Sequence, residues 1–231
     1  MAGVLIVNGS PKRADASNTH RLAARFCEDL RKNVSGLQVD FISLSERDVQ
    51  PCRGCMTCTL TGTCVIEDEL PAIRKTIQDS DLLVLASPVH MRHVSSLFQN
   101  LVERFLVDLH TFPYIGKPFC ALTTTNGSGE DDALKYLTRV GLLLGAIPLG
   151  STFESRADGL DTKGYRRLLR KSERALLDRS TIRPTLMNSL YFSSMRKIIH
   201  DNGEFFPFES KLWDEKGWFH KSYKDLMRQE H

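Results

Sequence analysis

Residues 9–19 combine glycine, hydroxyl and amide residue types in one short stretch, Gly-Ser-Pro-Lys-Arg-Ala-Asp-Ala-Ser-Asn-Thr. An apolar run at residues 4–7 comes before it, and apolar residues at helical spacing follow it. The pattern predicts a loop that leads from a buried strand into a helix. Hydroxyls and backbone N–H groups at a helix start attract anions, so this loop is a candidate phosphate site. The simpler interpretation is an ordinary turn in which Ser17 caps the helix.

Two further polar stretches follow apolar runs in the same way. Residues 87–91 (Ser-Pro-Val-His-Met) come after one such run, and residues 124–129 (Thr-Thr-Asn-Gly-Ser-Gly) come after another. The first loop, residues 9–19, lacks both the P-loop pattern of nucleoside triphosphate sites and the G-x-G-x-x-G pattern of dinucleotide sites. Those two motifs are therefore excluded there.

Four of the six cysteines lie within residues 51–65, which we call the cysteine loop. They are Cys52, Cys55, Cys58 and Cys64. Thiols this close together along the chain are candidate metal ligands. Cys27 and Cys120 fall on a predicted helix face and in a predicted strand, so we expect both to be small core residues.

Strand and helix patterns alternate along most of the chain. Strands are predicted at residues 4–7, 37–42, 82–86, 119–123 and 146–153, and helices at 17–33, from 68, at 97–106, from 130 and at 162–180. This alternation predicts an α/β fold with a doubly wound, five-stranded parallel sheet. Because the dinucleotide motif is missing, the flavodoxin-like order 2-1-3-4-5 is favoured over the Rossmann order. All the polar loops, and the cysteine loop, then lie at the carboxyl edge of the sheet.

The amino-acid composition of the chain changes near residue 185. Nine of the nineteen aromatic residues follow that point, and disordered tails are poor in aromatics. We therefore divide the chain into a domain at residues 1–184 and a helical, aromatic-rich extension at 185–231. The extension either packs on its own domain or clasps a partner subunit.

Net charge is close to neutral, +3 for 231 residues, so no nucleic-acid partner is expected. The N-terminal apolar run is too short for a signal peptide, and no apolar stretch is long enough to span a bilayer. We expect a cytoplasmic protein with reduced thiols and no membrane partner.

Taken together, the three polar loops resemble those of the NADPH-dependent FMN reductase family of the flavodoxin-like superfamily, over about residues 3–180. The resemblance implies that the first loop holds the flavin phosphate, while the second and third border the flavin ring. It places His90 where the family usually has an aromatic residue. The cofactor-binding residues that it implies are Ser10, Lys12, Arg13, Ser17, Asn18, Thr19, Pro88, Val89, His90, Met91, Thr124, Thr125, Asn126 and Gly127.

The cysteine loop resembles the compact cysteine motif of iron–sulfur flavoproteins, a branch of the same superfamily. Its spacing, Cys-x2-Cys-x2-Cys-x5-Cys, is compatible with a [4Fe–4S] cluster on Cys52, Cys55, Cys58 and Cys64. Family relatives with a similar pattern carry no cluster, so both possibilities stay open. Structural zinc and a disulfide pair are less favoured, by spacing and by compartment respectively.

The resemblance implies an FMN-dependent NAD(P)H oxidoreductase that passes electrons to a small molecule or protein, with or without the cluster. The flavin carries the electrons in such enzymes, so no catalytic acid or base is assigned. A homodimer or homotetramer is expected, because loops alone leave part of the ring uncovered. The alternative is a non-enzymatic redox or metal sensor that uses the cysteine loop and the C-terminal segment to dock a partner.

Overall fold

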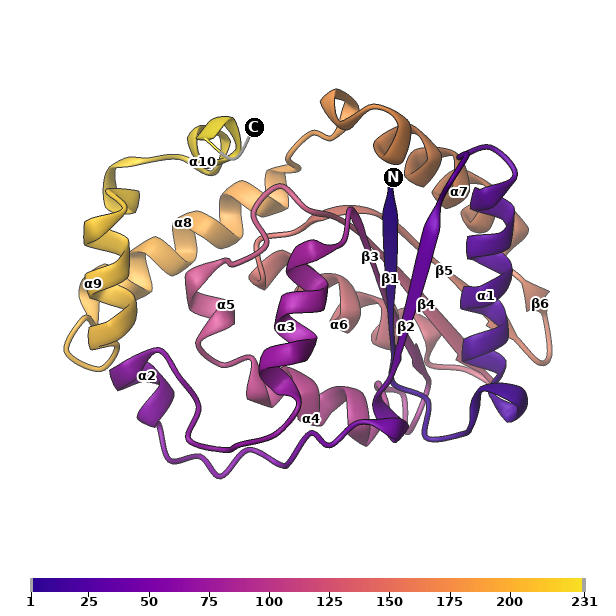
Figure 1. The fold of residues 1–231 in the computed structure, drawn as a ribbon, viewed down its shortest axis with the longest axis horizontal. Coiled ribbons are helices and arrows are strands. Elements are labelled where there is room, and N and C mark those ends of the chain that lie inside the picture. The colour runs from indigo at the N-terminus through magenta and orange to yellow at the C-terminus, as the bar shows by residue number, and fades with distance from the viewer. Residues whose placement is uncertain (1, 230–231) are drawn as a thin grey trace.

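The fold is built on one sheet flanked by helices on both faces (Figure 1). The computed structural model describes residues 2–229. Its strands are β1 (Gly3–Asn8), β2 (Gln38–Ser43), β3 (Leu82–Pro88), β4 (Pro118–Thr125), β5 (Ile147–Ser155) and β6 (Gly159–Leu160). The order is β2-β1-β3-β4-β5-β6, with β1 to β5 parallel and β6 antiparallel to β5. The predicted order 2-1-3-4-5 is confirmed, and β6 adds a sixth strand to the five that were predicted.

The five longer helices of this part of the chain keep close to their predicted bounds: α1 (Asn18–Arg31), α3 (Leu70–Asp79), α4 (Ser96–Arg104), α6 (Glu130–Leu143) and α7 (Thr162–Leu177). Two short helices, α2 (Thr57–Thr61) and α5 (Asp108–Thr111), and the short 3-10 turns η1 (Ala14–Ala16), η2 (Leu44–Glu46) and η3 (Arg179–Thr181) were not among the predicted elements. Apolar residues of α1 and α7 pack on one face of the sheet, and those of α3, α4 and α6 pack on the other. Cys27 and Cys120 are both buried in the core on the α1 side, as expected.

Burial on both faces explains why the central strands are so apolar. Leu83 and Val84 of β3 have no exposed surface, and β4 is buried along its whole length. Strand register brings Asn8 of β1 beside Ala86 of β3, and Pro88 of β3 beside Thr124 of β4. The three strands therefore end together, and the loops that follow them emerge at one edge.

The C-terminal segment forms α8 (Leu186–Asp201), α9 (Pro207–Glu215), the turn η4 (Trp218–His220) and α10 (Tyr223–Gln229). Trp213 is fully buried, stacks on Phe192 with ring centroids 5.1 Å apart, and meets Phe112, which follows α5, in a T-shaped arrangement. The Tyr223 hydroxyl donates to the Gly145 carbonyl. These aromatics belong to the same core as α1 and α7, so packing on its own chain accounts for them.

Within residues 2–229, no helix combines the length and the apolar character needed to cross a bilayer.

Candidate functional site

Hydrogen bonds join the three polar loops at the carboxyl edge of the sheet. The Gly9 amide donates to the Ala86 carbonyl at 2.8 Å, and the Val89 amide donates to the Thr124 carbonyl at 2.8 Å. The hydroxyls of Thr19 and Thr124 lie 2.7 Å apart, although 105 residues separate them in sequence. The ends of β1, β3 and β4 and the start of α1 thus form one connected surface.

A cleft of about 150 Å³ opens between these loops. Ten of the fourteen predicted cofactor-binding residues line it: Ser10, Lys12, Asn18, Thr19, Pro88, Val89, His90, Thr124, Thr125 and Asn126. Pro11, which the sequence analysis did not single out as a ligand, lines it as well. The structure therefore brings most of the predicted set together around one space.

The other four predicted residues do not line the cleft. Ser17 is buried, and its hydroxyl accepts the His20 amide at 3.1 Å as the N-cap of α1. The Arg13 side chain is 89% exposed and lies 3.9 Å from Asp15. Met91 is almost fully exposed, and Gly127 has open space beside it. Each of the four lies on a loop that borders the cleft, outside its lining.

The base of the cleft depends on a glycine and a buried amide. A Cβ atom at Gly9 would lie 2.8 Å from the Cβ of Phe98, so the loop can approach α4 this closely only with glycine. The Asn8 side-chain oxygen accepts the Ser10 amide at 3.0 Å. Among the described residues, the Asn8 side-chain nitrogen is buried without a partner. An unpaired buried donor below the Ser10 turn is the kind of group that a ligand oxygen would satisfy.

The second loop is a tight turn. His90 and His93 exchange backbone hydrogen bonds of 2.8 and 2.9 Å, while Met91 and Arg92 between them both have positive φ. This is the geometry of a two-residue hairpin turn. Arg92 also pairs with Asp132 at 2.8 Å, which ties the turn to the first turn of α6, just after the third loop. The turn holds His90 at the cleft wall and leaves Met91 at its tip.

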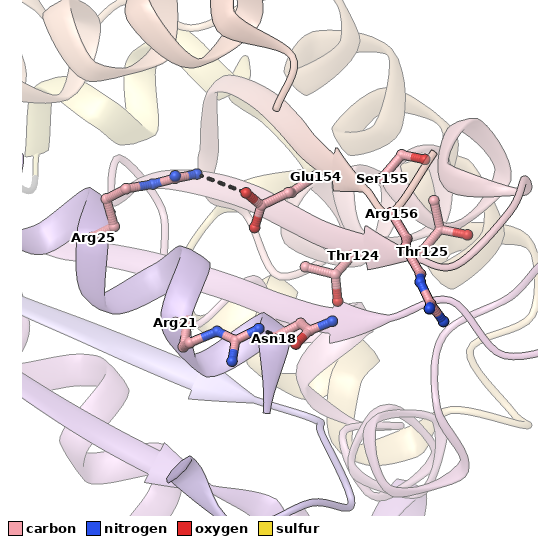
Figure 2. Close-up of a pocket in the computed structure, with 8 residues that line it drawn as sticks. All are labelled: Asn18, Arg21, Arg25, Thr124, Thr125, Glu154, Ser155 and Arg156. Atoms are coloured by element: carbon pink, nitrogen blue, oxygen red, sulfur yellow. Dashed lines mark hydrogen bonds and ion pairs between the residues drawn. The ribbon is translucent and has the colours of Figure 1, made fainter. Parts of the chain in front are cut away.

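A larger hollow of about 460 Å³ lies beside the cleft, between α1 and the end of β5. Figure 2 shows its lining: Asn18, Arg21, Arg25, Thr124, Thr125, Glu154, Ser155 and Arg156. Glu154 and Arg25 form an ion pair of 3.2 Å across it. Of its lining residues, only Asn18, Thr124 and Thr125, which it shares with the cleft, were predicted from the sequence.

The cysteine loop is exposed and only partly regular. Cys52 and Cys55 are exposed, whereas Cys58 and Cys64 are half-buried on either side of the end of α2. Hydrogen bonds from Thr57 lower the pKa of Cys55, while burial and the neighbouring thiol of Cys64 raise the pKa of Cys58. Among residues 2–229, no three Cys, His, Asp or Glu side chains are positioned as a metal-ligand set.

A buried ion pair closes the two ends of the cysteine loop. Arg104 of α4 donates to both carboxylate oxygens of Asp68, which follows the loop, and to the carbonyl of Gln50, which precedes it. The Gln50 amide in turn donates to Asp68 at 2.9 Å. Despite burial, the hydrogen bonds to Asp68 and the electrostatic effect of the nearby Cys64 thiol hold the pKa of Arg104 above its ordinary value. We call Gln50, Asp68 and Arg104 the loop neck.

The C-terminal segment supports the cysteine loop from the other side. Helix α2 packs on α9, and the Phe208 ring lies so close to Gly62 that a Cβ there would be 2.3 Å from it. Gly62 has φ +77 and ends α2. The cysteine loop is therefore placed by two elements that lie 36 and more than 140 residues away in sequence.

The comparisons with known proteins agree with this architecture. An iron–sulfur flavoprotein of Archaeoglobus fulgidus is 24% identical over 216 residues, covering 91% of this chain and 96% of that protein. One from Clostridioides difficile is 26% identical and covers 64% and 65% of the two chains. Among solved structures, an FMN-dependent NADH-azoreductase of Bacillus anthracis in complex with FMN superposes with a TM-score of 0.56. It shares 15% identity, over 79% of this chain and 100% of that one.

An NADH:FMN oxidoreductase in its apo form gives a TM-score of 0.58 at 19% identity, over 80% of this chain and 95% of that one. At these identities the solved structures establish the fold. The family model for NADPH-dependent FMN reductases matches residues 2–158, which include β1 to β5 and all three cleft loops. The chain therefore belongs to the NADPH-dependent FMN reductase family.

Proposed function

We propose that the protein is an FMN-dependent NAD(P)H oxidoreductase whose flavin is held by the three connected loops. The observation that carries the proposal is the cleft itself, where eleven residues from three distant parts of the chain meet, ten of them predicted from the sequence. Ser10, Lys12, Asn18 and Thr19 would hold the flavin phosphate, because they offer hydroxyl, ammonium and amide donors near the start of α1. Family membership and the FMN named for the azoreductase structure support the same ligand.

The remaining cleft residues would orient the ring. Val89 and His90 form one wall, and Thr124, Thr125 and Asn126 form the other. When bound, FMN supplies the hydride and electron chemistry, and the protein supplies position and electrostatics. Arg13, Ser17, Met91 and Gly127 remain proposed flavin residues on the loops that border the cleft. No side chain is proposed as an essential acid or base.

The size of the cleft favours a shared site. Pockets for small molecules usually measure about 300–1,000 Å³, and this cleft is smaller. Part of the ring would lie outside it and be covered by a second subunit of a homodimer or homotetramer. Small electron donors and acceptors would reach the ring there.

Flavin content and turnover test the proposal. The purified chain should be yellow, take up one FMN per chain and oxidise NAD(P)H. Protein that fails to bind FMN would refute the proposal. Protein that binds FMN but oxidises neither nucleotide would favour the sensor alternative.

We further propose that the cysteine loop carries a [4Fe–4S] cluster. Four free thiols lie in one loop, and Cys52 and Cys55 are accessible for loading. A thiol-only set of four is the usual donor set for such clusters, and several relatives are named iron–sulfur flavoproteins. When bound, the cluster would pass single electrons. A reducing compartment such as the cytoplasm would keep these thiols available.

Metal analysis after anaerobic purification decides this second proposal. About four iron and four sulfide per chain are expected, with loss of both in Cys58→Ser. Cys27→Ser, which changes a thiol in the core, is the matched control and should retain them. Iron and sulfide near zero in the wild type would contradict the cluster while leaving the flavin proposal intact.

A further inference from the structure

The hollow beside the flavin cleft has no role in the function proposed so far. At about 460 Å³ it is within the range of small-molecule sites, whereas the cleft is not. Its floor is formed by the buried residues Thr125 and Ser155, and its walls by arginines of α1 and by the chain that follows β5. It is therefore a formed space between secondary-structure elements.

The charge of this hollow is strongly positive. Three arginines line it, and Glu154 is the one acidic residue among its described lining residues. Glu154 pairs with Arg25 at 3.2 Å, so these two charges largely cancel. Arg21 and Arg156 then provide two exposed guanidinium groups without a carboxylate in the hollow to neutralise them. Guanidinium groups bind phosphate oxygens in a bidentate manner, better than they bind most other groups.

Local hydrogen bonds hold both arginines at the hollow. The Arg156 amide donates to the Thr125 carbonyl at 2.9 Å, which fixes its backbone to the end of β4. Arg21 lies on the first turn of α1, and its guanidinium donates to the Asn18 side-chain oxygen. The two side chains therefore face the same hollow from opposite elements, as Figure 2 shows.

The hollow adjoins the flavin cleft. Asn18, Thr124 and Thr125 line both spaces. A ligand that reached the flavin ring from this side would place its distant end among the arginines. That end must be anionic to gain from them, and its size must exceed that of a single phosphate to fill the hollow.

We propose that this hollow is the subsite for the adenosine 2′-phosphate end of the reduced dinucleotide donor, with Arg21 and Arg156 as the residues that bind the phosphate. The inference rests on the proposed function, because it assumes a dinucleotide that reduces the bound flavin. An acidic side chain in such a site usually accepts the ribose 2′-hydroxyl and favours NADH, whereas nearby arginine accommodates the 2′-phosphate. Here Glu154 is neutralised by Arg25, so the two free arginines favour NADPH.

A second ligand could offer a phosphate to the same two arginines: a second FMN molecule that accepts electrons from the bound flavin. The experiment separates the two by titrating the FMN-loaded full chain with 2′,5′-ADP, 5′-AMP and excess FMN in a calorimeter. The variants are Arg21→Gln and Arg156→Gln. Arg170→Gln is the matched control, because it removes an exposed arginine of α7 that does not line the hollow.

We expect 2′,5′-ADP to bind the wild type at least about tenfold more tightly than 5′-AMP, since a charge-assisted contact contributes about that factor or more. Each of the two variants should remove most of this difference, and Arg170→Gln should preserve it. Equal binding of the two adenosine nucleotides, or variants that leave the difference intact, would overturn the inference.

Two further results would also overturn it. A second equivalent of FMN that competes with 2′,5′-ADP would assign the hollow to a flavin acceptor. Loss of the first FMN in both variants would assign it to the phosphate of the bound flavin. The same titration on flavin-free chain keeps the two proposals apart, because a 2′-phosphate preference that Arg156→Gln abolishes there supports the subsite even if FMN fails to bind.

Discussion

Arg104 and Asp68 form a buried ion pair, with Nη2 and Oδ1 3.2 Å apart and both side chains almost fully shielded from solvent. Asp68 lies at the downstream end of the cysteine loop, and Arg104 also donates to Gln50 at the upstream end. The pair thus holds both ends of the cysteine loop at the end of α4. It defines where the four cysteines can lie.

Arg104→Gln should therefore destabilise the protein by about 3–5 kcal/mol, because it leaves the Asp68 carboxylate buried without its counter-charge. The free energy of unfolding in urea measures the effect. Arg53→Gln removes an exposed arginine from the same loop and should change stability by no more than about 0.5 kcal/mol. If both substitutions changed the free energy of unfolding by the same small amount, the loop neck would contribute little to stability.

The same pair predicts a pH dependence. Burial opposes ionisation, but hydrogen bonds from Arg104, Gln50 and Leu70 hold the pKa of Asp68 below its ordinary value of 3.8. A carboxyl whose folded pKa is depressed adds stability above its unfolded pKa and loses it as the pH falls through the folded value. The difference in unfolding free energy between wild type and Asp68→Asn should be constant near neutral pH and shrink below about pH 4. A difference that grew in acid would contradict this account.

Gly9 and Gly3 offer a matched test of the cleft floor. In Gly9→Ala the new methyl group would lie 2.8 Å from Phe98, whereas in Gly3→Ala the nearest atom outside the adjoining residues, an Asp81 carboxylate oxygen, is 3.9 Å away. Gly9→Ala should cost about 1–3 kcal/mol of stability by overpacking and weaken FMN binding, because the loop must move. Gly3→Ala should retain wild-type FMN affinity. Flavin fluorescence quenching gives the affinities, and tight FMN binding by Gly9→Ala would argue against a role for this close approach.

Phe208 tests whether the C-terminal segment holds the cysteine loop in place. Its ring packs on Gly62, and the substitution Phe208→Ala would remove that contact. We expect faster amide hydrogen exchange in residues 52–64, because local opening is easier where packing is lost. Phe205→Ala removes an aromatic that is 65% exposed and should leave exchange there unchanged. Identical exchange in the two variants would mean that the segment does not restrain the loop.

Much of the fold followed from local pattern. The continuous apolar runs of β1, β3 and β4 and the stripes of α1 and α4 marked both the elements and their order. Strand β6 has only two residues, too few for a periodic signal, and depends on its antiparallel pairing with Glu154 and Ser155. Helix α2 follows Met56, which has a left-handed backbone conformation, and packs on α9, so no local signal in the sequence indicated this helix.

The residues of the candidate site also differed in whether the sequence could predict them. The flavin loops were predictable because polar residues follow buried strands, and parallel strands end at one edge. Arg104 and Asp68 were not, because Arg104 lies at the end of an ordinary amphipathic helix, Asp68 lies just before another, and the pair forms across 36 residues. Arg21 and Arg25 lie on the polar side of α1, where periodicity assigns them to solvent, and only the sheet register brings Glu154 and Arg156 opposite them.

The central claim is that the three loops bind FMN, and a direct titration tests it most sharply. Flavin-free chain should quench the fluorescence of one equivalent of FMN, and Thr124→Val, which removes the hydroxyl 2.7 Å from Thr19, should weaken that binding about tenfold. Thr138→Val on α6 should bind FMN as the wild type does. Failure of the wild-type chain to quench FMN, or equal affinity in all three proteins, would contradict the account.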